Sequence, residues 1–158
     1  MSLDSSSPSS VDPSNFRLGI VSSQFNQSLV ISLLHRVTEV IEENGTPLEF
    51  INETVPGANE IPSAMALILE KKALSCMIAL GVVIKGSTSH HHLVAECAGH
   101  ALQDLSIRYK TPIINGIIVA DDLSTAKDRI VGSIDRGGEF AHAALQMAHL
   151  KEKWTKIS

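Results

Sequence analysis

The nine residues CMIALGVVI, at positions 76–84, constrain the fold more than any other stretch of this chain. They carry almost no polar side chain, so a strand formed by them must be covered on both of its faces. Sheets covered on both faces are usually parallel, and parallel neighbours are joined by crossover connections that normally contain a helix. We therefore expect helices before and after this strand, packed on the two faces of one sheet.

Strand-like and helix-like stretches alternate along the whole chain. Further strands are expected at 16–23, 48–55 and 112–119. Apolar residues recur with helical spacing between them, next to residues that start or stop helices, which predicts helices at 28–44, from about Pro62, and at 92–109, 124–131 and 139–151. This alternation predicts an α/β fold with three layers, α/β/α, built on a four-stranded, mainly parallel sheet.

The composition is that of one ordinary globular domain. The chain has 158 residues, 44% of them hydrophobic, which is enough to bury a core without disulfides. Its net charge of −4 offers no basic surface for nucleic acid, and no apolar run is long enough to span a bilayer. The start, MSLDSSSPSSVDPSN, lacks the features of a secretory signal. We expect a flexible tail or arm over 1–15, a single domain over 16–158, a cytoplasmic location, and neither nucleic acid nor membrane as a partner.

Both cysteines lie inside apolar stretches, and we expect both to be reduced residues of the core. Cys76 opens the central strand. Cys97 belongs to the helix expected over 92–109, where Leu93, Val94 and Leu102 are expected on the same inward face.

Ligands of open α/β sheets bind beyond the carboxyl ends of the strands. Four segments directly follow expected strands, at 24–26, 55–60, 85–90 and 119–122. These four segments are the candidate components of a binding site.

Three consecutive histidines, His90, His91 and His92, follow the central strand. Consecutive residues of a helix point about 100° apart, so these side chains cannot all grip one metal ion if they open a helix. No nearby residue completes a metal-ligand set, and we expect no metal. Two interpretations stay open: solvated histidines at a helix start, or an imidazole that transfers protons near neutral pH.

The segment Gly86-Ser87-Thr88 precedes the expected helix. Glycine lets the backbone approach a ligand, and the first N–H groups of a helix lack partners within it, so the segment suits a phosphate or carboxylate group. Ser87 or Thr88 could instead be a simple helix cap. Arg129 is either solvated or the partner of a bound phosphate.

The segment VPGANEIP, at 55–62, has prolines around Asn59 and Glu60. It is either an ordinary turn or a rigid shelf that hydrogen-bonds a polyhydroxylated ligand. Phe25 follows the first expected strand in a polar context, and it either packs as a hydrophobic staple on the next helix or stacks on a flat ring.

Taken in order, these stretches resemble the lumazine synthase (6,7-dimethyl-8-ribityllumazine synthase) family over about 16–150. The resemblance rests on VPGANEIP at 55–62 and ALGVVIKGSTSH at 79–90, with support from QFN at 24–26, NGIIV at 115–119, Arg129, and DRGGEFAHAAL at 135–145. It implies a flavodoxin-like fold and a transferase of riboflavin biosynthesis. Such an enzyme condenses 5-amino-6-(D-ribitylamino)uracil with 3,4-dihydroxy-2-butanone 4-phosphate through imine formation, phosphate elimination and ring closure.

The resemblance also implies residue roles. His90 would transfer protons. The ribitylaminouracil would be held by Phe25, Ala58, Asn59, Glu60, Val82, Val83, Ile84 and Asn115, and the butanone phosphate by Ser87, Thr88 and Arg129, with Gly86 and Arg136 as additional candidates. Asn115 and Arg129 would come from an adjacent subunit. The resemblance implies no cofactor or metal, a homopentamer or a larger assembly with sites at subunit interfaces, and riboflavin synthase as a candidate partner.

The chain departs from the family pattern at several of these positions. Asn59 and Asn115 stand where an aromatic residue is usual, His91-His92 replaces an aromatic-aspartate pair, and Cys97 stands where glutamate is common. An alternative is therefore a non-catalytic or slow homologue that binds flavins or pterins. A flavodoxin-like signalling or scaffold domain is a third hypothesis, but the strand ends lack the acidic features that it needs. The stretch RIVGSIDR, at 129–136, lacks a glycine-rich bend, which predicts a free pentamer rather than a shell.

Overall fold

The computed structural model describes residues 10–87 and 90–156. Within these ranges every expected strand and helix is present. The elements are β1 (Arg17–Ser23), α1 (Gln27–Asn44), β2 (Glu49–Val55), the short 3-10 helix η1 (Ala58–Glu60), α2 (Ile61–Leu69), β3 (Cys76–Ile84), α3 (His90–Tyr109), β4 (Ile113–Ala120), α4 (Leu123–Ile130) and α5 (Arg136–Thr155). Expected boundaries differ from these by a few residues at most helix ends.

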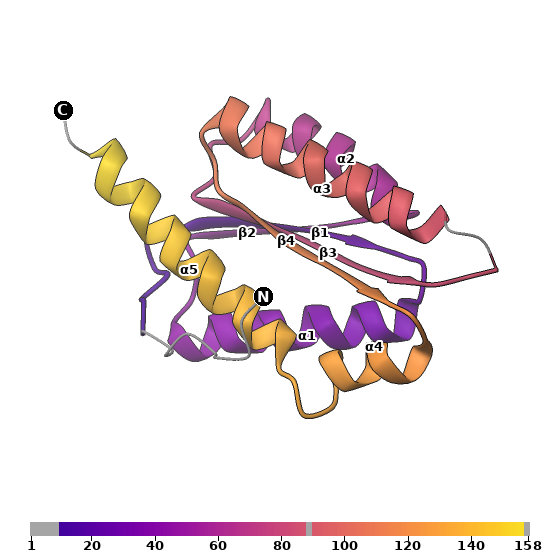
Figure 1. Ribbon diagram of the computed structural model, residues 1–158. Helices are drawn as coiled ribbons and strands as arrows, with labels where there is room; N and C mark the ends of the chain where they lie inside the picture. Colours follow the sequence, from indigo (N-terminus) through magenta and orange to yellow (C-terminus); the bar gives the residue numbers. More distant parts are fainter. Residues whose placement is uncertain (1–9, 88–89, 157–158) are drawn as a thin grey trace.

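The strands form one four-stranded sheet in the order β2-β1-β3-β4, and every pair of neighbours is parallel. Helices α2 and α3 cover one face of the sheet, whereas α1, α4 and α5 cover the other (Figure 1). This arrangement confirms the three-layer, flavodoxin-like α/β/α fold.

The central strand β3 contributes to two hydrophobic clusters, one on each face of the sheet. Ile78 and Leu80 belong to the cluster under α1, α4 and α5, while Met77 and Ala79 belong to the cluster under α2 and α3. All four side chains are fully buried. The uniformly apolar sequence of this strand therefore has the predicted cause, which is burial from both sides.

Local capping residues set several helix ends. Asp122 caps α4 by accepting a hydrogen bond from the backbone N–H of Thr125, as its position before the helix predicts. Pro62 lies in the first turn of α2, where its missing N–H is not needed. Gly45 follows α1 with a φ of 141°, a conformation that favours glycine. Asp135 caps α5 by accepting from Gly138, so this helix begins three residues earlier than the expected Glu139.

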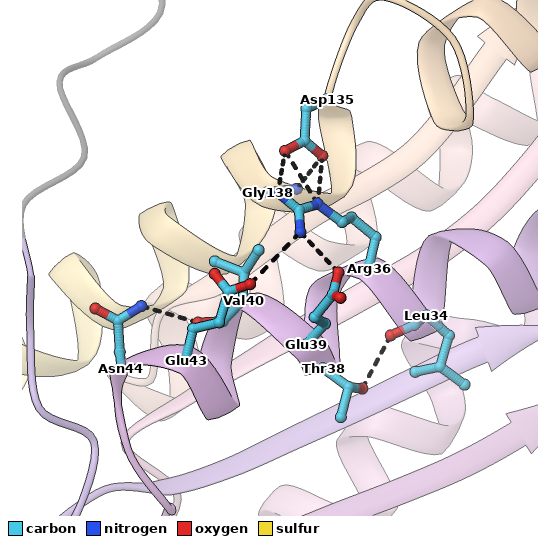
Figure 2. A network of polar contacts seen from close by, with 9 residues as sticks. All are labelled: Leu34, Arg36, Thr38, Glu39, Val40, Glu43, Asn44, Asp135 and Gly138. Carbon is cyan, nitrogen blue, oxygen red and sulfur yellow. Dashed lines mark hydrogen bonds and ion pairs between the residues drawn. The ribbon is translucent and has the colours of Figure 1, made fainter.

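An ion pair joins helices α1 and α5 on the face of the sheet away from α2 and α3. Arg36 donates from Nη2 to Asp135 Oδ2 at 2.7 Å and from Nε to the same carboxylate at 3.1 Å, and it also contacts Glu39 (Figure 2). Gly137 allows this approach, because a Cβ there would lie 2.8 Å from the Arg36 side chain. The hydrogen bonds with Arg36 hold the pKa of the Asp135 carboxyl below its usual range.

The segment before β1 contacts the domain from residue 11 onward. Val11 packs against the larger hydrophobic cluster, and the Phe16 N–H donates to the Pro13 carbonyl oxygen at 2.8 Å. Residues 1–9 of the expected tail lie outside the described residues. No helix within 10–87 and 90–156 combines the length and the hydropathy needed to cross a membrane.

The Arg36–Asp135 pair should make stability depend on pH in one direction. Because the folded-state pKa of Asp135 lies below that of the unfolded chain, its contribution is present above about pH 4 and is lost as pH falls through the folded-state pKa. Asp135→Asn keeps a helix-capping side chain but removes the charge. Since half of this carboxylate is exposed, we expect the free energy of unfolding at pH 7 to fall by only about 0.5–1 kcal/mol.

Urea unfolding at pH 7 and at pH 3 measures this effect, and the difference between wild type and Asp135→Asn should be smaller at pH 3, where the carboxyl of the unfolded chain is largely protonated. Asp121→Asn, at an exposed aspartate before α4, is the matched control. An equal loss of stability at both pH values would contradict the ion-pair explanation.

Candidate active site

A cavity of about 660 Å³ opens beyond the carboxyl ends of β1 and β3. These strands are neighbours in the sheet, but the chain leaves β1 towards β2 on one side and leaves β3 towards β4 on the other. Such a reversal of strand order creates a crevice, which is the usual ligand site of open α/β sheets. Of the four predicted strand-end segments, those at 24–26, 55–60 and 85–90 line the cavity and that at 119–122 does not.

The turn after β1 is fixed to the end of β3. Asn26 adopts a left-handed conformation with a φ of 55°, and its Nδ2 donates to the Val82 carbonyl oxygen at 2.8 Å. The preceding Phe25 is 70% exposed on the cavity wall. A side chain so exposed is not packed as a hydrophobic staple, so the face of the ring is open at the cavity wall.

The predicted shelf is the 3-10 helix η1 and the residue before it. Gly57 starts this shelf, and a Cβ at Gly57 would lie 2.8 Å from Glu60 Oε2 and 3.3 Å from the ring of Phe25. The bare backbone of Gly57 therefore lets the side chains of Glu60 and Phe25 approach closely. Ala58, Asn59 and Glu60 all line the cavity, as predicted.

The opposite wall consists of the end of β3 and the first two turns of α3. Val82, Val83, Ile84 and Gly86 line the cavity before the helix, and His90 and His91 line it within the helix. His91 is buried, whereas His90 and His92 are exposed, so the expectation of three solvated histidines is wrong for His91. The rings of His91 and His92 lie against each other, with their centroids 4.0 Å apart. Among the described residues, no group of three histidine, cysteine or acidic side chains is arranged to hold a metal ion.

Cys97 is an exposed residue of the cavity wall, so the prediction that it belongs to the core is wrong. Leu93 is likewise 57% exposed. Residues at 90, 93, 94 and 97 share one face of α3, and this face meets the cavity before the helix reaches the core at Ala98 and Leu102. Positions 93, 94 and 97 follow His90 by three, four and seven residues, which is the spacing of one helix face. This spacing could have identified them as site residues from the sequence. Sequence reasoning also did not single out Ser23, Asn26 or Gly57 as individual site residues.

Several predicted site residues lie outside this cavity. Asn115 accepts a hydrogen bond from the Ile117 N–H at 3.1 Å, Arg129 donates to the Val119 carbonyl oxygen at 3.2 Å, and Arg136 contacts Glu139 at 2.6 Å. Ser87 is exposed and does not line the cavity. Thr88 lies outside the described residues. One chain therefore brings together the residues predicted for a ring-bearing ligand other than Asn115, with His90 and Gly86, but not the predicted arginine.

Comparison with known proteins gives a consistent match over nearly the whole chain. The model of a family described as 6,7-dimethyl-8-ribityllumazine synthase matches residues 15–152. A 6,7-dimethyl-8-ribityllumazine synthase from Nitrosomonas europaea is 36% identical over 143 residues, covering 90% of this chain and 85% of that protein. Proteins of the same name from Methylobacterium radiotolerans and a Polaromonas species are 35% and 33% identical, covering 92% and 90% of this chain and 90% and 92% of those proteins.

The two cysteines should differ sharply in reactivity. Cys97 is open to the cavity, whereas Cys76 is fully buried, and burial raises the pKa of its thiol to about 12. Iodoacetamide should therefore label one thiol per folded chain and two per unfolded chain, as read by mass spectrometry. The Cys97→Ser variant should take up no label while folded. Labelling of Cys76 in the folded protein would contradict the structure.

Proposed function

The chain belongs to the 6,7-dimethyl-8-ribityllumazine synthase family, and we propose that the cavity beyond β1 and β3 is its active site. The protein is a transferase of riboflavin biosynthesis. It condenses 5-amino-6-(D-ribitylamino)uracil with 3,4-dihydroxy-2-butanone 4-phosphate to form 6,7-dimethyl-8-ribityllumazine. One observation carries the assignment of the site: three separate strand-end segments meet there and bring Phe25, Glu60 and His90 to the walls of one cavity.

The ribitylaminouracil binds between Phe25 and the end of β3. The exposed ring of Phe25 suits stacking on a flat heterocycle, and the backbone of Val82, Val83 and Ile84 offers polar groups to the edge of that heterocycle. Asn59 and Glu60 supply an amide and a carboxylate on the facing shelf, which suit the hydroxyl groups of the ribityl chain.

His90 moves protons during the condensation. The amine attacks the ketone to give an imine, phosphate is then eliminated, and ring closure expels water. Each step requires proton transfer, for which an imidazole is suited near neutral pH. His90 is exposed at the start of α3 and lines the cavity, so it can contact both substrate and solvent. Holding two reactants side by side supplies much of the remaining acceleration.

The butanone phosphate binds at the start of α3. Gly86 lines the cavity, and a 20-residue helix follows, whose first N–H groups favour an anion. We assign Ser87 and Thr88 to this phosphate. Arg129 completes the site from an adjacent subunit, which accounts for its position outside the cavity of its own chain.

The proposed assembly is a homopentamer. Asn115 lies on β4, an edge strand of the sheet, and Arg129 lies on α4 directly after it, so both can reach a neighbouring subunit. We also assign Arg136 to the phosphate side of the interface. We further propose that the pentamer is free rather than part of a shell. We also propose a cytoplasmic location and riboflavin synthase as a partner. The alternative of a non-catalytic ring-binding protein has no support from the relatives, which are synthases by name.

Mixing the purified protein with both substrates tests the function, because the product is fluorescent. We expect turnover by the wild type, and we expect His90→Ala to reduce kcat about 100-fold or more while the ribitylaminouracil still binds. His100→Ala is the matched control, since His100 is an exposed histidine of the same helix that does not line the cavity. Lack of product above the uncatalysed rate would refute the function, and equal rates for His90→Ala and wild type would remove His90 from the mechanism.

Mixed oligomers test whether Arg129 acts across an interface. Arg129→Ala alone should raise KM mainly for the phosphate-bearing substrate, because it removes a charge that pairs with phosphate. If His90 and Arg129 of one site come from different subunits, random co-assembly of His90→Ala and Arg129→Ala chains should restore about a quarter of the wild-type sites. Separately assembled and then mixed variants are the control. Failure of co-assembly to restore activity would contradict the shared site.

A further inference from the structure

One buried polar group of the cavity has no role in the account above. Ser23 is one of the residues that line the cavity, and it is only 3% exposed. Its Oγ finds no hydrogen-bond partner among residues 10–87 and 90–156. A buried hydroxyl without a partner is unfavourable by about as much as a lost hydrogen bond, and such groups are rare in folded proteins.

The position of Ser23 explains why the protein itself does not satisfy this hydroxyl. Ser23 is the last residue of β1 and pairs with Val55 of β2. A Cβ placed on Gly81 of β3 would lie 3.2 Å from Ser23 Oγ and 3.5 Å from the Ala58 side chain. The hydroxyl therefore lies in a recess beside the bare backbone of Gly81, near the side chains of Ala58 and Ile117, and Ser23 itself is part of the cavity lining.

The recess lies on the side of the cavity that we assign to the ring-bearing substrate. Ala58 borders the recess, and Ala58 is also the first residue of the η1 shelf. Phe25 follows Ser23 by two residues. The candidate phosphate-binding residue Gly86 and the proposed proton-transfer residue His90 belong to the other wall, beyond the end of β3.

We propose that Ser23 is a substrate-binding residue, whose hydroxyl hydrogen-bonds a polar atom of the ribitylaminouracil and thereby sets the depth of that substrate in the cavity. The inference rests on the proposed function, because it takes its ligand from there. A hydroxyl both donates and accepts, so it can serve a carbonyl, an amino group or a sugar hydroxyl. Gly81 supports this role, since any side chain there would crowd the hydroxyl.

The neighbouring Ser22 provides a matched control. It is also 3% exposed, but its Oγ donates to the Glu53 carbonyl oxygen at 3.5 Å, and it does not line the cavity. The two variants Ser23→Ala and Ser22→Ala therefore remove the same group from adjacent, equally buried positions of one strand.

Calorimetric titration with the ribitylaminouracil should show about tenfold weaker binding for Ser23→Ala, which corresponds to about 1.4 kcal/mol, and unchanged binding for Ser22→Ala. The KM for the phosphate-bearing substrate should stay within about twofold of wild type. Without ligand, the melting temperature of Ser23→Ala should equal or exceed that of wild type, because an unsatisfied buried hydroxyl has been removed.

Other results would overturn the inference. Equal binding by Ser23→Ala and Ser22→Ala would mean that water alone satisfies the hydroxyl. A loss of affinity confined to the phosphate-bearing substrate would refute the assigned ligand. A lower melting temperature of ligand-free Ser23→Ala would show that the hydroxyl has a structural partner. Because binding is measured without turnover, a wild type that binds the ribitylaminouracil but forms no lumazine would refute the proposed function alone.

Discussion

Burial of β3 on both faces is the constraint on which the rest of this structure depends. A strand with apolar side chains on both sides needs helices above and below it, and parallel crossovers supply them. The chain meets this need by placing β1 and β4 on either side of β3 and by sending α2 and α3 to one face and α1, α4 and α5 to the other (Figure 1). The change of direction between β1 and β3 then opens the cavity. The site is thus a consequence of how one apolar strand is covered.

The sequence predicted the layers, and the positions of the strand ends predicted three of the segments that line the cavity. The proline, glycine and asparagine residues at 55–62 favour a bend in the chain. The polar segment around Phe25, directly after a strand, favours an exposed turn. The sequence did not predict Cys97 correctly, because helical periodicity shows which residues share a face but not what covers that face. The first two turns of α3 border the cavity, and there only Val94 also packs against the core, whereas Ala98, Leu102 and Leu105 of the same helix are buried.

Sequence reasoning has a second limit, which concerns contacts between subunits, and it is seen at Asn115, Arg129 and Arg136. Their motifs identified them as site residues, yet the folded chain holds each in a local contact outside its own cavity. A site built by two subunits would produce this result, because the fold of one chain fixes where such residues lie but not which surface they meet. We propose that the second surface is the cavity of an adjacent subunit. The sequence of a single chain carries little information about it, since interface residues differ little in composition from other surface residues.

Polar groups at the amino ends of the strands differ from those at the carboxyl ends in whether the chain itself satisfies them. At the amino ends of β3 and β4, the Lys151 ammonium donates to the Leu74 carbonyl oxygen at 2.7 Å and to Thr111 Oγ1 at 2.8 Å, so polar groups there are satisfied within the chain. At the carboxyl ends, Phe25 is exposed and the hydroxyl of Ser23 is buried without a partner among the described residues. Such features also occur elsewhere, since Ile107 and Trp154 are exposed and His142 Nδ1 has no hydrogen-bond partner among the described residues. What distinguishes the carboxyl ends is that an exposed ring and a buried hydroxyl lie beside the same cavity, and this coincidence supports our proposal that the substrates bind there.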